Sequence, residues 1–140
     1  MAQPLDDAQY AALLSFHRAL RRFKRWSERR AAEAGLTAAQ HELLLAVRVL
    51  GGPRGPTVGD VADALFVRHH SAVELIDRVA RAGLITRRRD ADDGRLVRLA
   101  LTRRGRDRLT ELADVHLEEL GRIDPVLGEL VEPAHVYPTA

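Results

Sequence analysis

The chain has 140 residues, of which 46% are hydrophobic, 30% charged and only 4% aromatic, a length and composition typical of one folded domain with a sizeable core. The absence of cysteine excludes disulfides, zinc fingers and thiol redox sensing. No apolar run approaches the roughly 20 residues that cross a bilayer, and the N-terminus lacks the pattern of a signal peptide. The sequence therefore predicts a cytoplasmic protein.

The arginines are unevenly distributed, although the formal net charge is only +2. Residues 68–108 contain twelve arginines and six acidic residues, whereas residues 111–140 contain seven acidic residues and one arginine. Because Lys24 is the only lysine, arginine is the usual cation of this chain, but that preference does not explain the clustering. A basic middle and an acidic end predict one face for a polyanion and another facing away from it.

Residues 5–34 are predicted to form a long helix that ends at Gly35. Its apolar residues step by three and four positions, which is typical of a seam that packs against another helix. The seam residues are Leu13, Phe16, Leu20 and Phe23. A second helix should begin after Thr37, because Thr37 and Gln40 have the spacing of a capping box. The run GGPRGP at residues 51–56 then breaks the helical pattern.

A helix-turn-helix is predicted over residues 57–82. Thr57 is expected to cap a short helix, a brief turn follows near Phe66 and Val67, and a second helix spans residues 68–82. On one side of this second helix lie apolar residues at helical spacing, namely Ala72, Leu75, Ile76 and Val79. The opposite side is polar, with His70, Ser71, Glu74, Asp77, Arg78 and Arg81. Gly83 is expected to end the helix, because glycine adopts the left-handed conformation without penalty.

Two strand-like runs follow, at residues 85–89 and 96–101. The Asp-Gly pair at residues 93–94, between these runs, is typical of a tight β-hairpin. A polar helix followed directly by a basic hairpin suits a major groove and the neighbouring DNA backbone. The predicted fold class is mainly α with a small β-hairpin wing, a winged helix-turn-helix flanked by N- and C-terminal dimerisation helices.

Thr102 is expected to cap a last helix, which the pair Asp124-Pro125 should end. Residues 126–131 are predicted to add one more short helix, and residues 133–140 to form a frayed tail.

Three segments of the chain resemble the MarR family of winged-helix regulators: LTAAQHELLLAV, VGDVADALFVRHHSAVELIDRVARAGLITR and DADDGRLVRLALTRRGRDRL. The most specific part is the wing pattern, in which Asp93 and Arg95 precede Leu101 and Thr102. The resemblance implies a homodimeric repressor that binds a pseudo-palindromic operator and that a small aromatic or acidic ligand releases. Arg68 departs from the family, since many members have Ser or Thr there, and this predicts a weaker cap for the recognition helix.

The sequence predicts one domain over residues 1–140, with a winged helix-turn-helix DNA-binding region at 37–102. Helical dimerisation regions are predicted at 5–34 and 103–132, because each is too apolar to be left alone and a second copy of the chain is the simplest partner. The expected partners are double-stranded operator DNA, a second copy of the chain and a small-molecule effector, with no membrane. No cofactor is expected.

The predicted DNA contacts come from the recognition helix and the hairpin, and they are Arg68, His69, His70, Ser71, Glu74, Arg78, Arg87, Arg89 and Arg95. Glu74 has two interpretations, since it suits a hydrogen bond from cytosine N4 and equally an ion pair with His70 or Arg78. Asp77 should orient an arginine, either Arg81 or one from the hairpin. Arg95 follows the wing turn and is expected in a narrow minor groove, where the negative potential is enhanced.

An apolar effector cleft is predicted on the first two helices, although each of its residues also suits an ordinary core or dimer seam. The set is Phe16, His17, Leu20, Trp26, His41, Leu44 and Arg48. Neither a metal site nor an active site is predicted, because His69 and His70 point about 100° apart on a helix and no nucleophile accompanies the histidines. Two other functions stay open, a ligand-independent regulator and a sequence-independent architectural protein, although the acidic end argues against the second.

Overall fold

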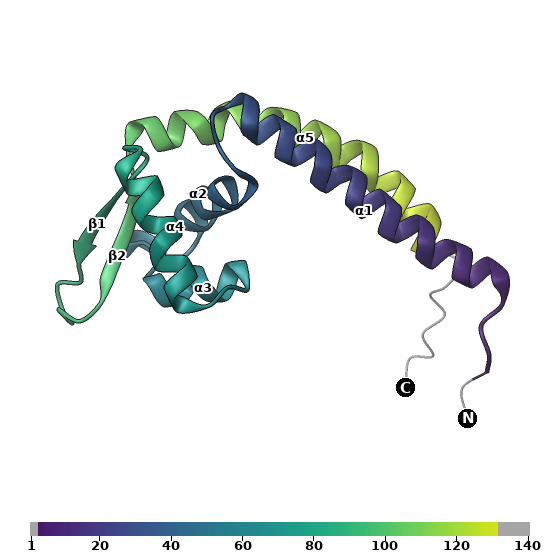
Figure 1. Ribbon diagram of the computed structural model, residues 1–140, viewed down its shortest axis with the longest axis horizontal. Helices are drawn as coiled ribbons and strands as arrows, with labels where there is room; N and C mark the ends of the chain where they lie inside the picture. The colour runs from purple at the N-terminus through teal and green to yellow at the C-terminus, as the bar shows by residue number, and fades with distance from the viewer. Residues whose placement is uncertain (1–2, 132–140) are drawn as a thin grey trace. The chain divides into compact units, whose positions relative to one another are not determined.

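The computed structural model describes residues 3–131, with their side chains up to residue 123. In chain order the elements are α1 (Asp7–Glu33), α2 (Ala38–Val49), the 3-10 turn η1 (Gly52–Arg54), α3 (Val58–Leu65), α4 (His69–Arg81), β1 (Ile85–Arg89), β2 (Val97–Leu101) and α5 (Arg103–Val131) (Figure 1). This mainly helical fold with one β-hairpin confirms the predicted fold class. No helix among the described residues is long and apolar enough to cross a membrane.

The chain divides into two compact units. The first combines the chain up to Arg29 with the chain from Asp114 onward, and the second is Arg30–Ala113. The buried apolar core of the described residues lies in the second unit, from Ala31 to Leu112. The prediction of a single domain over residues 1–140 stays a prediction.

Capping boxes begin both α2 and α3. The Thr37 hydroxyl accepts a hydrogen bond from the Gln40 backbone N–H at 3.1 Å, and the Gln40 side chain accepts one from the Thr37 N–H at 3.0 Å. Thr57 and Asp60 repeat this exchange at 3.2 and 2.9 Å. Each box satisfies backbone donors that a helix otherwise leaves unpaired, and a cap of this kind contributes about 1 kcal/mol. The predicted caps at Thr37 and Thr57 are confirmed.

Helix α4 packs against α3 and β1, which places the predicted recognition helix beside the hairpin (Figure 1). Ala72, Ile76 and Val79 are buried, as the helical spacing predicted. Gly83 follows the helix with a φ of 78°, the left-handed conformation expected at this stop. The turn between α3 and α4 contains Phe66, whose φ of 55° and ψ of 42° are also left-handed. An L-residue pays roughly 1–2 kcal/mol for this conformation, and the sequence pattern did not predict it.

Strands β1 and β2 pair antiparallel, with Ile85 opposite Leu101 and Arg89 opposite Val97. Ile85 and Leu99 are buried, so one face of the hairpin closes the core. The other edge of β2 is occupied by the segment before α3, because the Leu99 N–H donates to the Pro56 carbonyl at 2.9 Å. The base of the wing is therefore tied to the start of the helix-turn-helix.

Helix α5 corrects the prediction for the C-terminal region. The expected break at Asp124-Pro125 and the separate helix over 126–131 are wrong, because α5 is continuous from Arg103 to Val131. A proline removes one intrahelical hydrogen bond, yet the residues on both sides still continue the helix when they favour it. Residues 133–140, predicted as a tail, lie outside the described residues.

The connection of the hairpin spans residues 90–96, one residue more than lay between the two predicted runs. Gly94 lacks the positive φ that a two-residue Asp-Gly hairpin turn requires. Instead the Leu96 N–H donates to the Asp93 carbonyl at 3.0 Å, which closes an ordinary four-residue turn. The hairpin predicted from the Asp-Gly pair is confirmed, and Gly94 lies within this four-residue turn.

This difference predicts that Gly94 tolerates a side chain. Gly94→Ala should change the free energy of unfolding by less than about 0.5 kcal/mol, because an added Cβ meets no atom within 4 Å and the backbone is not left-handed. Gly83→Ala is the matched control. It should lower the free energy of unfolding by about 1 kcal/mol, because Gly83 has a φ of 78°. Urea unfolding of both variants measures the difference. Equal losses would show that the wing turn needs glycine after all.

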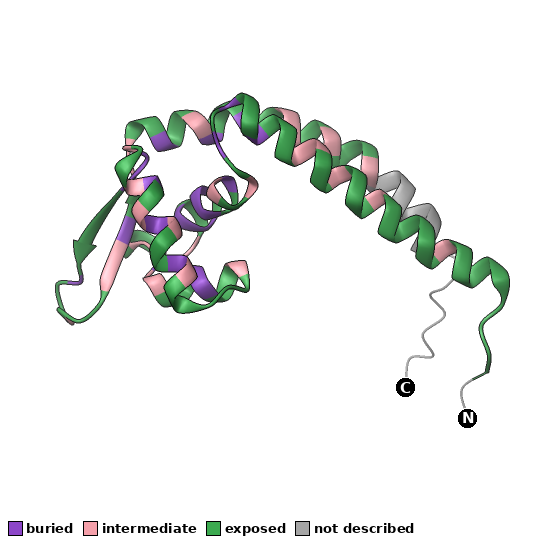
Figure 2. Ribbon diagram, viewed as in Figure 1, coloured by how far each residue is buried: buried purple, intermediate pink, exposed green. Residues whose placement is uncertain are grey.

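The first unit joins α1 to the second half of α5 through an aromatic cluster. The His116 ring lies edge-on to Trp26, with centroids 4.8 Å apart, and Phe23 stacks on Trp26 at 6.0 Å. The Ser27 hydroxyl and the His116 Nε2 lie at a hydrogen-bonding distance of 2.8 Å. Elsewhere on α1 large apolar side chains remain exposed, including Leu13 at 51% and Leu20 at 45% (Figure 2).

Candidate nucleic-acid interface

Helix α4 presents a continuous polar surface opposite its buried stripe. His70, Glu74 and Arg78 are exposed, and Ser71 and Asp77 are half-buried beside them. No ion pair joins Glu74 to His70 or Arg78 within the described part of the chain, so its carboxylate stays available to a hydrogen-bond donor from outside. Donors and acceptors of this kind match the polar edges of base pairs in a major groove.

The N-terminus of α4 has no side-chain cap. Arg68 is the N-cap residue, and its side chain makes no capping hydrogen bond, as the departure from Ser or Thr predicted. Among the described residues, the first N–H groups of the helix therefore have no intrahelical or side-chain acceptor, and they carry the positive end of the helix dipole. Backbone N–H groups in this arrangement suit a phosphate oxygen.

An ion pair connects α4 to the hairpin. The Arg87 guanidinium of β1 donates to the carboxylate of Asp77 in α4. The sequence predicted that Asp77 orients an arginine and left open whether it belongs to the helix or to the hairpin. Its partner is the hairpin arginine, so the helix and the wing are held in one orientation.

The tip of the wing carries a second, exposed ion pair. The Arg95 Nε and Nη2 atoms donate to the two oxygens of Asp93 at 3.1 and 3.2 Å, and the Arg95 backbone N–H donates to the same carboxylate. The hydrogen bonds from the Arg95 side chain, and to a smaller extent the one from its backbone N–H, lower the pKa of Asp93. Because a guanidinium has five N–H groups, the others remain available, and the Arg95 side chain is 90% exposed. Arg95 is thus held at the wing tip with free donors.

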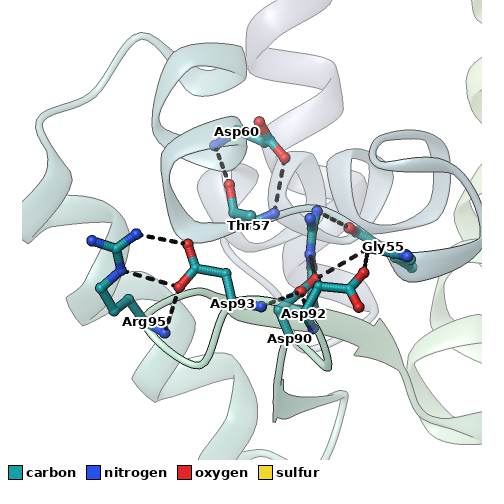
Figure 3. A network of polar contacts seen from close by, with 9 residues as sticks. Gly55, Thr57, Asp60, Asp90, Asp92, Asp93 and Arg95 are labelled. Carbon is teal, nitrogen blue, oxygen red and sulfur yellow. Dashed lines mark hydrogen bonds and ion pairs between the residues drawn. The ribbon is translucent and has the colours of Figure 1, made fainter.

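Asp90 fixes the shape of the wing loop from inside (Figure 3). Its side chain is only 4% exposed, and one oxygen accepts the backbone N–H groups of Asp92 and Asp93 at 2.9 and 3.0 Å. The other oxygen accepts Arg98 Nε at 2.8 Å, and Arg98 also donates to the Gly55 carbonyl at 3.1 Å. The Arg98 hydrogen bond and then the two backbone hydrogen bonds lower the pKa of Asp90 to about 2.

The roles of Asp90 and Arg98 were not predicted from the sequence. In the sequence Asp90 is one of three acidic residues in this loop, and only the fold places Arg98 beside it. The alternation of side chains along β2 was the signal available in the sequence. Because successive residues of a strand face opposite sides of the sheet, Arg98 faces away from the core in which its neighbour Leu99 is buried.

We expect Asp90→Asn to lower the melting temperature at pH 7, because the variant loses a charge-assisted bond to Arg98. The folded-state pKa of about 2 lies below the ordinary value of 3.8, so this stabilisation is complete above about pH 4 and disappears as the pH falls toward 2. The difference in melting temperature between wild type and variant should therefore disappear as the pH falls from about 4 toward 2. Thermal melts followed by circular dichroism measure this difference. Asp92→Asn is the control, since its pair with Arg54 is exposed and should contribute little. Equal melting temperatures for all three proteins at pH 7 would contradict this role.

The second unit brings all the predicted DNA-contacting residues together. Eight of the nine are exposed and Ser71 is half-buried; they lie on α4, at its N-cap, on β1 and at the wing tip. The predicted ligand residues fall in both units: Phe16, His17, Leu20 and Trp26 in the first, and His41, Leu44 and Arg48 in the second. Leu44 is fully buried in the core and His41 is nearly so, whereas Arg48 is exposed. No group of three metal-ligating side chains gathers among the described residues.

A helix-turn-helix whose second helix is polar outward, braced by an arginine-rich hairpin, defines a winged helix-turn-helix protein. Comparison with known proteins identifies which kind. Residues 34–96 match the family model of the MarR family. No curated protein matches the chain.

Several solved structures share the fold. The crystal structure of the MarR family transcription regulator SP03579 has 25% sequence identity, covers 90% of this chain and 82% of its own, and gives a TM-score of 0.73. AbsC, a MarR family transcriptional regulator from Streptomyces coelicolor, has 22% identity over 95% of each chain and a TM-score of 0.75. MepR from Staphylococcus aureus, in a complex with DNA, has 21% identity over 80% of this chain and 81% of its own, with a TM-score of 0.70.

The family model thus matches the winged helix of this chain at residues 34–96, and MarR family regulators share its fold, which confirms the resemblance found in the sequence. The family is one of regulators and not of enzymes.

Proposed function

We propose that this chain is a DNA-binding transcriptional regulator, a repressor, that binds a pseudo-palindromic operator as a homodimer and is released by a small aromatic or acidic ligand. The observation that carries the proposal is the exposed polar face of α4 beside the arginines of the wing, within a MarR-family winged helix. Since its partner would be genomic DNA, the proposal includes the cytoplasmic location expected from the sequence.

The winged helix supports a division of tasks on DNA. The outward residues of α4, especially His70, Ser71 and Glu74, match the donors and acceptors of base edges. The uncapped N–H groups of α4 and the arginines of β1 match phosphate oxygens, which position the protein without reading sequence. Arg95 at the wing tip suits the narrow minor groove beside the site. A related protein of the same fold, MepR, is known in a complex with DNA.

The exposed apolar side chains of α1 support a homodimer. A monomer gains nothing by leaving Leu13, Leu14 and Leu20 half exposed on one long helix, whereas a second copy would bury them. A two-fold dimer presents two recognition helices to half-sites about one DNA turn, roughly 10 base pairs, apart. Two-fold symmetry of the protein then implies an inverted repeat in the operator.

Selection of bound sequences from a random DNA pool tests this proposal. It should recover an inverted repeat whose half-site centres lie about 10 base pairs apart. A pool that converges on a single half-site would argue against the dimer. A pool that never converges would favour the architectural alternative, which reads no sequence.

The effector is the part of the proposal that rests on residue chemistry alone. In the first unit Phe16, Leu20 and Trp26 supply apolar and aromatic surface for an aromatic ligand. A ligand that favours the DNA-incompetent state by about 1–3 kcal/mol would weaken operator binding about 5- to 150-fold. Benzoates and phenols, screened by thermal shift and then added to an operator titration, test this. If no compound binds or alters the affinity, the chain acts as a ligand-independent regulator.

A further inference from the structure

Phe66 combines two unfavourable features in the turn between α3 and α4. Its side chain is 96% exposed, although it is a large aromatic residue. Its backbone has a φ of 55°, and it is the one residue other than glycine with a positive φ among residues 3–131. Glycine would adopt this conformation without penalty, and a polar residue would suit the exposure better.

The end of α3 explains the left-handed backbone, because the Val67 N–H donates to the Ala62 carbonyl at 3.1 Å and the Phe66 N–H to the Asp63 carbonyl at 3.3 Å, the pair of bonds that closes a helix around a left-handed residue. It does not explain why that residue is an exposed phenylalanine, since glycine is the usual choice there. The Phe66 N–H closes the end of α3 by donating to the carbonyls of Ala62 and Asp63, but any residue except proline supplies that N–H. The ring makes no aromatic contact with another described side chain. A non-glycine residue kept in a left-handed conformation costs stability, and such residues cluster at functional sites. The side chain is thus directed outward at a cost to stability.

The position of Phe66 connects it to the candidate nucleic-acid interface. It stands two residues before Arg68, the N-cap of α4, so the two Cα atoms are at most roughly 7 Å apart. In helix-turn-helix proteins the first residues of the recognition helix contact the base edges. The residues that follow Phe66 and Val67 are Arg68, His69 and His70, which favour a polyanion over an apolar protein surface. Figure 1 shows this turn leading from α3 into α4.

We propose that Phe66 is a specificity-determining residue whose ring packs against the C5-methyl group of a thymine in the major groove. A phenyl ring has no hydrogen-bond donor for a phosphate, and the thymine methyl is the apolar group that base pairs expose in that groove. The left-handed backbone holds the ring outward beside the N-terminus of the recognition helix. This inference rests on the proposed DNA-binding function and adds a residue to it.

The test compares wild type with Phe66→Gly on the operator selected from the random pool. The variant relieves the strained backbone, so its melting temperature should equal or exceed that of the wild type. Its affinity for the operator should fall about tenfold, as expected when an aromatic ring loses part of its buried area, while its affinity for shuffled DNA stays unchanged. Val49→Ala, which shortens another exposed apolar side chain, is the control and should change neither quantity.

Replacement of single thymines by uracil in the operator identifies the contact. Uracil lacks the methyl group. Replacement at the contacted position should therefore lower the operator affinity of the wild type roughly fourfold, the equivalent of one buried methylene. Phe66→Gly should be insensitive to the same replacement. The inference is wrong if Phe66→Gly keeps full operator affinity, if it keeps the sensitivity to uracil, or if it loses affinity because it becomes monomeric. A wild-type chain that binds no DNA would overturn the proposed function together with this inference.

Discussion

Leu13→Asp combined with Leu20→Asp is expected to lower operator affinity by about 10³-fold. Both leucines are exposed on α1, seven residues apart, and therefore lie on one face of the helix. In the proposed dimer each aspartate would be buried without a partner, which costs several kcal/mol per charge. A separated protomer binds one half-site and loses the avidity of the second, an effect of about 10²–10⁴-fold. Light scattering and a DNA titration of the same sample measure both consequences.

A matched control places the same charges on the opposite face of α1. Ser15→Asp combined with Arg22→Asp shifts each substitution by two residues, or roughly 200° around the helix. Both residues are exposed, so this variant should remain dimeric and keep most of its affinity. A monomeric wild-type chain with full operator affinity, or equal behaviour of the two double variants, would rule out the α1 seam as the dimer contact.

The recognition helix and the wing should respond differently to mutation. Glu74→Ala should weaken binding to the cognate operator by about 1–3 kcal/mol and relax the preference at one base position, because Glu74 is exposed on α4 and has no ion-pair partner in the described protein. Arg95→Ala should weaken all sequences by similar factors. It should also reduce the slope of log affinity against log salt by about 0.9 for each phosphate that the variant no longer neutralises.

Titrations of both variants against operators with single base changes, at several salt concentrations, separate these effects. Arg18→Ala is a useful control for Arg95, since it removes an exposed arginine of α1, outside the wing. If Arg95→Ala altered base preference while Glu74→Ala left it intact, the assignment would be reversed, with the wing reading the base sequence and the helix contacting phosphates.

Local features of the sequence predicted most of the fold. Thr37 and Gln40 lie three residues apart at the start of an apolar pattern, and the capping box they form depends on nothing distant. Gly83 likewise ends α4 because of its own conformational freedom. The buried stripe of α4 follows from periodicity alone. Predictions of this kind succeed because the physical cause lies within a few residues.

The errors and omissions arise where distant residues decide. Pro125 carries a strong local signal for a helix end, yet α5 continues through it to Val131. The Asp-Gly pair predicted the hairpin, but not that the Asp90 carboxylate binds the loop N–H groups and, through Arg98, holds the loop against β2. The left-handed backbone of Phe66 contradicts its residue type, and no local rule predicts it. Strain of that kind is found only by looking at the structure.

The most direct test of sequence-specific binding compares the selected operator with a shuffled duplex of the same length and composition, titrated at salt concentrations from about 50 to 200 mM. We predict that the operator binds at least about 10³-fold more tightly than the shuffled duplex. Both affinities should fall steeply with salt, because arginines on α4 and the wing neutralise phosphates. Equal affinities for the two duplexes at every salt concentration would contradict sequence-specific binding.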